Sequence, residues 1–210
     1  MKHAIKPLTF RIVLAAIFIT LSACSSLQQP PVPATAIIDW AAHQQQLSEL
    51  TRWTIFGKLG IRSPEQSNSA RFNWQQQNQQ FDIQISNLLG QTVASLISQN
   101  DEVLIDIAGE GRFITTNPEQ LLRDELGWTL PVSILEHWVK GIPAPGLAAN
   151  QQFNNQGLLE TLHQAGWQIN FSRYQTLDSH TLPGKIRLQQ GNITLTLLIK
   201  DWALNTGPAP

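Results

Sequence analysis

The sequence has one cysteine, Cys24, among 210 residues. A single cysteine cannot form a disulfide within the chain, so no internal disulfide stabilises the fold. Charged residues are also scarce, at 14% of the chain against about 25% in typical domains, and glutamine replaces many of them on the polar faces. The protein surface is therefore expected to be built largely from uncharged polar side chains.

Motifs that would indicate catalysis are missing as well. Neither nucleotide-binding pattern, G-x-x-x-x-G-K-[ST] or G-x-G-x-x-G, occurs, so the chain has no means of using phosphate energy. The histidines lack the H-E-x-x-H spacing of a metal site, and no G-x-S-x-G sequence exposes a nucleophile. We expect no catalytic residues, metal or cofactor. An esterase that acts on lipids remains the enzymatic alternative.

The amino-terminal apolar run is shorter than the roughly 20 residues of a membrane-spanning helix. It covers residues 12–23, about a dozen positions, and follows the basic residues Lys2, Lys6 and Arg11. This order is typical of a secretory signal. The run ends in Leu21-Ser22-Ala23-Cys24, which places the cysteine where a lipoprotein signal peptidase cuts. We therefore predict that residues 1–23 are removed and that Cys24 begins the mature chain.

Lipidation of Cys24 would anchor the protein to a membrane, because about two acyl chains suffice for stable anchoring. The next residue is Ser25. In bacterial lipoproteins generally, a residue other than aspartate at this position favours the outer membrane over the inner one. Residues 24–36 are rich in serine and proline and are expected to form an extended tether to a single domain, residues 37–210.

The charge balance of the mature chain argues against one class of partner. The signal carries three of the 14 Lys and Arg and none of the 15 Asp and Glu, which leaves the remaining 187 residues with a net charge of −4. Nucleic acid is bound through basic patches that neutralise phosphates. We therefore expect no nucleic-acid partner.

Most of the domain alternates between apolar and polar residues with period two, which predicts antiparallel strands. We expect strands near residues 53–61, 70–74, 81–85, 93–98, 102–108, 112–115, 157–163, 167–174, 185–190 and 193–203. About ten antiparallel strands in one domain have to curl or close. The predicted fold is therefore mainly β, a strongly curved sheet or incomplete barrel, with an interior that is able to enclose a small ligand.

Three segments interrupt this alternation with helical spacing. Asp39 is placed to cap a helix that ends near Thr51, and Asn117-Pro118 begins a helix that Gly127 stops. A further helix begins near Pro131, with Gly141 and Pro143 as its stop signals. Residues 142–155 are expected to form a loop. The last two helices are expected to cover the concave side of the sheet.

The turn after the strand at 81–85 is unusual because it places Leu88 and Leu89 between the turn residues Asn87 and Gly90. An exposed leucine forgoes roughly 1.5–3 kcal/mol that burial would provide. One interpretation is that this turn folds back onto the core. The other is that the two leucines enter a membrane or engage an incoming lipid.

Several of these segments together resemble a known family. In order along the chain they are the lipidation signal, the strand at 53–62, Ala70-Arg71-Phe72-Asn73-Trp74-Gln75-Gln76, Asn87-Leu88-Leu89-Gly90, Gly127-Trp128-Thr129-Leu130-Pro131-Val132 and residues 135–143. The chain resembles the LolB family of outer-membrane lipoprotein receptors over nearly all of its mature length.

The resemblance implies an unclosed antiparallel barrel of about 10–11 strands, with helices over an apolar cavity that takes lipoprotein acyl chains. It also implies that the periplasmic carrier LolA hands over lipoprotein cargo and that the receptor inserts this cargo into the phospholipid of the outer membrane. A protruding residue assists the insertion, and Leu89 lies at the matching position here. Leu88 departs from the proline of many members, at some cost in turn rigidity. We expect a lipid-anchored monomer on the periplasmic side of the outer membrane.

Side chains on the inferred inward faces are the candidates for the cavity wall. They are Trp53, Phe72, Trp74, Ile83, Ile85 and Trp138. The same pattern fits residues that fill a solid core, because periodicity does not distinguish an inner wall from a packed interior. A lipid-anchored structural or ligand-binding lipoprotein without acyl-chain transfer is the alternative function, and it predicts a filled interior.

Overall fold

The computed structural model describes residues 37–64 and 67–204. The predicted signal, Cys24 and the predicted tether lie outside these residues. The described residues belong to one compact unit that begins at Ile37. Within them, no helix has both the length and the apolar character needed to cross a bilayer.

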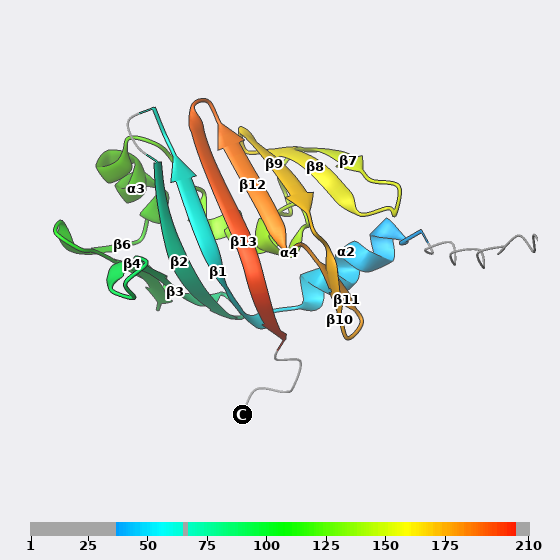
Figure 1. Ribbon diagram of the computed structural model, residues 1–210, viewed down its shortest axis with the longest axis horizontal. Helices are drawn as coiled ribbons and strands as arrows, with labels where there is room; N and C mark the ends of the chain where they lie inside the picture. Colours follow the sequence, from blue (N-terminus) through cyan, green and yellow to red (C-terminus); the bar gives the residue numbers. More distant parts are fainter. Residues whose placement is uncertain (1–36, 65–66, 205–210) are drawn as a thin grey trace, which may run out of the picture. The chain divides into compact units, whose positions relative to one another are not determined.

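An antiparallel sheet of eleven strands forms the body of this unit (Figure 1). In the order of their pairing the strands are β6 (Gly111–Thr115), β5 (Glu102–Ile107), β4 (Thr92–Gln99), β3 (Gln80–Ser86), β2 (Ser67–Gln77), β1 (Arg52–Arg62), β13 (Ile193–Leu204), β12 (Lys185–Gln190), β9 (Trp167–Ser172), β8 (Leu159–Gln164) and β7 (Ala149–Phe153). The first and last strands, β1 and β13, pair in the middle, and the edge strands β6 and β7 do not pair with each other. The predicted mainly β, unclosed architecture is confirmed.

The described residues include three α-helices, and their caps follow the sequence signals. Helix α2 (Trp40–Glu49) begins after Asp39, whose carboxylate accepts from the backbone N–H of Ala41 at 3.0 Å. Helix α3 (Pro118–Leu126) begins after Asn117, whose side chain accepts from the N–H of Gln120 at 3.0 Å. It ends at Gly127, where a φ of 75° suits a residue without a Cβ.

The third helix differs slightly from its prediction. A short 3₁₀ turn, η1 (Val132–Ile134), precedes the α-helix α4 (Leu135–Lys140), so the segment after Pro131 is helical but not α-helical from its start. Gly141 ends α4 with a φ of 80°, as the stop signal indicated.

Two strand segments were not predicted. The expected loop at 142–155 contains the edge strand β7, whose five residues are mostly exposed and lack an apolar alternation. A separate two-stranded hairpin, β10 (Gln175–Leu177) and β11 (His180–Leu182), follows β9. All three strands are short, and β7 has no apolar stripe, whereas β11 ends in Leu182, which is fully buried in the core. The prediction of a loop at 142–155 was therefore wrong for Ala149–Phe153.

The two faces of the sheet differ in character. Side chains of one face form the hydrophobic core together with residues of all three helices, including Leu47, Leu122 and Trp138. In Figure 1, α4 lies behind the central strands. The opposite face of the central strands carries exposed polar and charged side chains.

Candidate functional site

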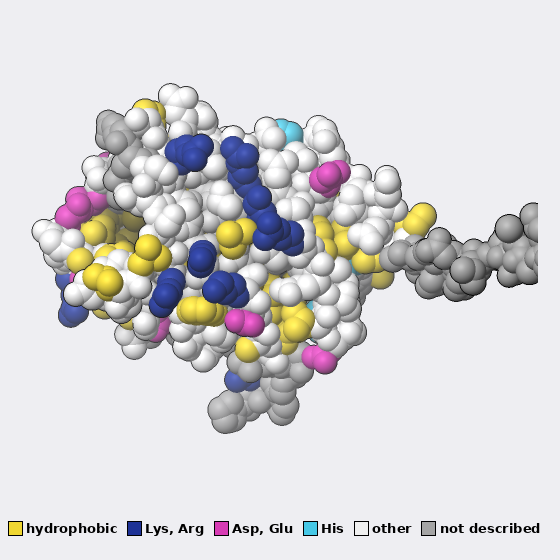
Figure 2. Space-filling model, viewed as in Figure 1, with side chains coloured by type: hydrophobic (Ala, Val, Ile, Leu, Met, Phe, Trp, Pro, Cys, Tyr) yellow, Lys and Arg dark blue, Asp and Glu magenta, His cyan; other side chains and the backbone are white. Residues whose placement is uncertain are grey.

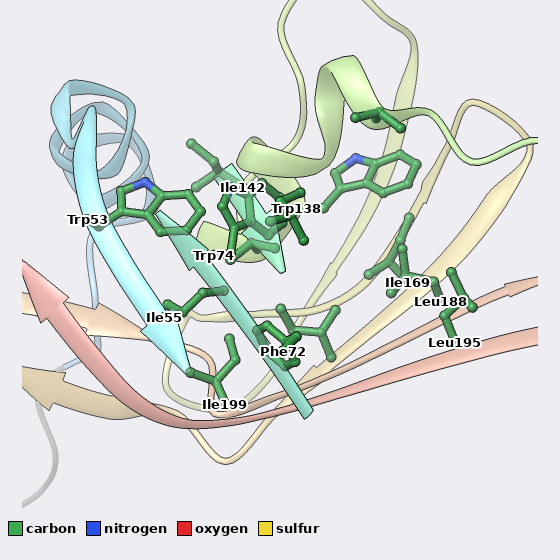
Figure 3. Close-up of a cluster of buried hydrophobic side chains, with 14 of the residues drawn as sticks. Trp53, Ile55, Phe72, Trp74, Trp138, Ile142, Ile169, Leu188, Leu195 and Ile199 are labelled. Atoms are coloured by element: carbon green, nitrogen blue, oxygen red, sulfur yellow. The ribbon is translucent and has the colours of Figure 1, made fainter. Parts of the chain in front are cut away.

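The six predicted cavity-wall residues lie on one side of the sheet in a single cluster. Figure 3 labels four of them, Trp53, Phe72, Trp74 and Trp138. Five of the six are buried, with exposed fractions between 0% for Trp53 and Trp138 and 9% for Ile83, while Ile85 is half-buried against them. The register explains this, because Phe72 pairs with Ile85 and Trp74 pairs with Ile83 on the neighbouring strand. The structure therefore brings together all the residues that the sequence pattern assigned to the interior.

Tryptophan rings form the centre of this cluster. The ring of Trp53 lies 5.1 Å from that of Trp74 and 5.5 Å from that of Trp202, both in tilted contacts. Such aromatic pairs add about 0.5–1.5 kcal/mol to the burial of their area. Trp202 was not among the predicted residues, although the register places it opposite Ile55 on the same face. Its position at the end of the last apolar strand was the available signal.

A buried glutamine holds the segment around α4 on the sheet. The side chain of Gln164, on β8, accepts from the indole N–H of Trp138 at 2.8 Å and from the backbone N–H of Ala144 at 2.9 Å. It also donates to the carbonyl of Ala144 at 2.9 Å. A buried polar group is stable only when it is paired in this way, so Gln164 fixes both the helix and the chain after it. Nothing in the sequence pattern indicated this role.

Helix α4 also carries ionisable side chains into the interior. Lys140 is 2% exposed, and its Nζ donates to the carbonyl of Leu50 at 3.1 Å, just beyond the end of α2. Burial lowers the pKa of Lys140, and the neighbouring Glu136 acts against that shift. Burial likewise raises the pKa of Glu136, and Lys140 opposes it. The two helices are thus joined by a polar contact under the apolar cluster.

His137 is a further ionisable side chain of α4 whose pKa is shifted by burial. Burial, with a smaller effect of Lys140, lowers its pKa from 6.5 to about 4. Its Nδ1 is buried without a hydrogen-bond partner among the described residues. The folded protein therefore keeps this imidazole neutral under conditions where an unfolded chain protonates it.

We expect acid to destabilise the protein through His137. As pH falls from 6.5 towards 4, the unfolded state binds a proton that the folded state does not, so the free energy of unfolding decreases. Since His137 is only partly buried, the loss between about pH 7 and pH 5 is about 1 kcal/mol. The measurement is urea unfolding at both pH values. Between them, the free energy of unfolding of His137→Gln should fall by about 1 kcal/mol less than that of the wild type.

The matched control for this experiment is His163→Gln, because His163 is exposed on β8. This variant should keep the acid sensitivity of the wild type. An equal change in both variants would contradict the role assigned to His137.

The loop between β3 and β4 exposes its two leucines. Leu88 is 64% exposed and Leu89 is 86% exposed. The interpretation in which this turn folds back onto the core is therefore not the one that the structure adopts. The two side chains present an apolar tip to the surroundings.

Asn87 holds this loop in a defined shape. Its side-chain oxygen accepts from the backbone N–H groups of Leu89 and Gln91, each at 3.0 Å. Its backbone carbonyl accepts from Gly90 N–H at 3.0 Å, and Gly90 has a φ of 87°. This loop geometry does not require a proline at position 88.

The family model described as "Outer membrane lipoprotein LolB" matches residues 51–202. Proteins named "Outer-membrane lipoprotein LolB" are similar over 163 residues, 78% of this chain. That of Pseudomonas syringae pv. syringae (strain B728a) is 41% identical, with 80% of its length covered. That of Stutzerimonas stutzeri (strain A1501) is 40% identical, with 79% covered.

Solved structures show the same fold at low sequence identity. A DUF1329 family protein from Desulfovibrio piger has a TM-score of 0.54 at 10% identity, covering 81% of this chain and 92% of that one. A LolA superfamily protein from Nitrosomonas europaea has a TM-score of 0.50 at 6% identity, covering 81% and 96%. At this identity the likeness supports the open sheet with its helices, and nothing about ligands.

Proposed function

Because this chain belongs to the LolB family of outer-membrane lipoproteins, we propose that it is a lipid-anchored receptor on the periplasmic side of the outer membrane. It accepts lipoproteins from the periplasmic carrier LolA by their acyl chains and inserts them into that membrane. The observation that carries the proposal is the large apolar cluster between one face of an unclosed sheet and its helices. No catalytic step is part of it.

The energetics of acyl chains require a direct handover. Each methylene group that moves from water to an apolar environment gains about 0.8 kcal/mol, so a lipoprotein with several acyl chains does not leave a carrier for water. We propose that transfer runs downhill from the carrier to this receptor and then to the bilayer. This route uses no nucleotide and needs one copy of the chain, the carrier, the cargo and outer-membrane phospholipid.

The acyl chains would enter the apolar cluster beneath α4. Trp53, Phe72, Trp74, Ile83, Ile85 and Trp138 are the proposed contacts. The low exposure of these side chains, between 0% and 9% for five of them, agrees with the filled interior that the structural alternative predicts. For the receptor function, an acyl chain therefore has to separate α4 from the sheet, and the hydrogen bonds of Gln164 to Trp138 and Ala144 resist that separation. The buried polar contact between Lys140 and Leu50 keeps the other end of the segment in place.

Binding of an acylated peptide tests this function directly. The protein used is the mature chain, residues 24–210, with Cys24→Ala so that it carries no acyl chains of its own. Because Trp53, Trp74 and Trp138 lie at the proposed site, the acylated peptide should change tryptophan fluorescence saturably, whereas the same peptide without its acyl chains should not. Addition of carrier should compete for the bound peptide.

The alternative of a structural lipoprotein makes the opposite forecast. If the acylated peptide neither binds nor competes with the carrier, the interior acts only as a core, and the receptor function is wrong. Binding that is equal for both forms of the peptide would place recognition on the peptide chain and would also contradict the proposal.

A further inference from the structure

The outward face of the central strands is basic, and its residues align in rows across four strands. In one row Lys185 pairs with Leu198, Leu198 with Lys58, and Lys58 with Arg71. In the second row, Arg187, Thr196, Gly60 and Ser69 follow one another in the same way. A third row consists of Gln189, Thr194, Arg62 and Ser67.

Five of the chain's 14 Lys and Arg residues therefore lie on this small area, although the protein as a whole is slightly acidic. They are Lys58, Arg62, Arg71, Lys185 and Arg187, here called the basic face. Figure 2 shows Lys and Arg side chains gathered over β1, β2, β12 and β13. Among the described residues none of the five takes part in an ion pair. Asp201 lies just beyond the first row, opposite Phe56.

The basic face contains a hollow of about 310 Å³. Arg62, Lys185 and Arg187 contribute its cationic groups. Hydroxyl groups come from Ser67, Ser69, Thr194 and Thr196. Cations and hydroxyl donors around a small hollow are the groups that bind phosphate oxygens.

The hollow exists because Gly60 has no side chain at its centre. A Cβ at Gly60 would have Thr196 as its nearest neighbour, 4.0 Å away, and the backbone there is not left-handed. The fold therefore does not require glycine at this position. Gly57 is different, because a Cβ there would lie 2.1 Å from the Leu198 carbonyl oxygen at a β-bulge. Glycine inside a strand weakens it, so Gly60 keeps a space open at some cost in stability.

We propose that the basic face is a membrane-docking surface and that its hollow binds the phosphate of a phospholipid headgroup. The proposal rests on the membrane location in the proposed function and adds to it the face that meets the bilayer. Basic residues near an anionic membrane surface each strengthen binding, and amphipathic contact adds to this attraction.

The position of the exposed leucines favours a membrane over an acidic protein as the occupant. Arg71, at the end of the first row, pairs with Ser86, the residue before the loop that carries Leu88 and Leu89. The apolar tip thus borders the basic face. A bilayer offers phosphates and hydrocarbon side by side, and an acidic protein surface offers only the charge.

Vesicle binding of the mature chain with Cys24→Ala tests the proposal. The probes are vesicles of phosphatidylethanolamine with and without phosphatidylglycerol, at low salt. Each removed cation should weaken binding to the anionic vesicles about fivefold, so Arg62→Gln/Arg187→Gln should lose about 25-fold. The control Arg112→Gln/Arg123→Gln removes the same charge from β6 and α3, which are not part of the basic face, and should lose no more than about twofold, since screening limits the effect of distant charges.

Gly60→Val separates the hollow from the charge around it. Valine favours strands, so the variant should be at least as stable as the wild type while it fills the hollow. Binding of Gly60→Val to anionic vesicles should fall several-fold. With the wild-type protein, inorganic phosphate alone should not produce the binding signal that anionic vesicles produce. If phosphate alone saturates the site and displaces vesicles from the wild type but not from Gly60→Val, the ligand is free phosphate and the docking role is wrong.

Other outcomes would also overturn the proposal. Equal losses in the two double variants would mean diffuse attraction without a site. Normal vesicle binding by Arg62→Gln/Arg187→Gln, combined with impaired transfer from the carrier, would assign the face to an acidic protein. Binding of the acylated peptide is measured in the same variants and should be unchanged, so failure of the docking surface is distinguishable from failure of the receptor function.

Discussion

Leu89→Glu should slow delivery of lipoprotein to vesicles by about one to two orders of magnitude while leaving the free energy of unfolding unchanged. Leu89 is 86% exposed, so the folded protein loses little when it is replaced. In the proposed inserted state the leucine is buried in hydrocarbon, which contributes about 1.5–3 kcal/mol. The measurement is the rate at which a labelled lipoprotein moves from the receptor to vesicles.

The matched control for this variant is Ile114→Glu. Ile114 is 67% exposed on the edge strand β6, so it removes a similar exposed apolar side chain at a different place. Delivery by this variant should remain at the wild-type rate. If both variants slow delivery equally, or if Leu89→Glu delivers normally, the loop has no special part in insertion.

Binding of the acylated peptide distinguishes the two steps in the Leu89→Glu variant. The proposed acyl contacts lie on the inward face, whereas Leu89 lies on an exposed loop. The variant should therefore load cargo normally and accumulate in the loaded state. Loss of loading would mean that the loop takes part in acceptance.

The local parts of the fold were predictable because their signals are local. Alternation with period two located the long strands, and the caps at Asp39, Asn117 and Gly127 lie where the sequence placed them. The edge strand β7 was missed because Ala149–Phe153 carries no apolar stripe. A strand that is fixed by pairing with β8 alone leaves little trace in its own sequence.

The sites were predictable only as sets of residues on the same face. Alternation assigned Trp53, Phe72 and Trp74 to the interior, but it did not reveal that Gln164 would pair with Trp138 from another strand. The basic face was not predicted at all. Its rows depend on the pairing of β1 with β13, which lie at opposite ends of the domain sequence, and register between distant strands is a property of the folded chain.

Removing the predicted lipid anchor should have the second large effect. The change is Cys24→Ala behind an ordinary secretory signal peptide, so that export and cleavage still occur. Several acyl chains on Cys24 make membrane attachment effectively permanent, whereas a protein without them keeps only reversible contacts. We expect the membrane-bound fraction in cells to fall about tenfold or more, with the protein recovered from the periplasm.

The control for anchoring is Ser25→Asp, which keeps the cysteine and should move the protein to the inner membrane without releasing it. Mass spectrometry of the wild type should find Cys24 acylated, and a bare thiol there would overturn the assignment. Any residual membrane binding of the Cys24→Ala protein should decrease with salt, because the basic face alone would then hold it to anionic lipid. Salt-resistant binding would instead mean that an apolar contact, with Leu88 and Leu89 as its candidates, holds the unanchored protein.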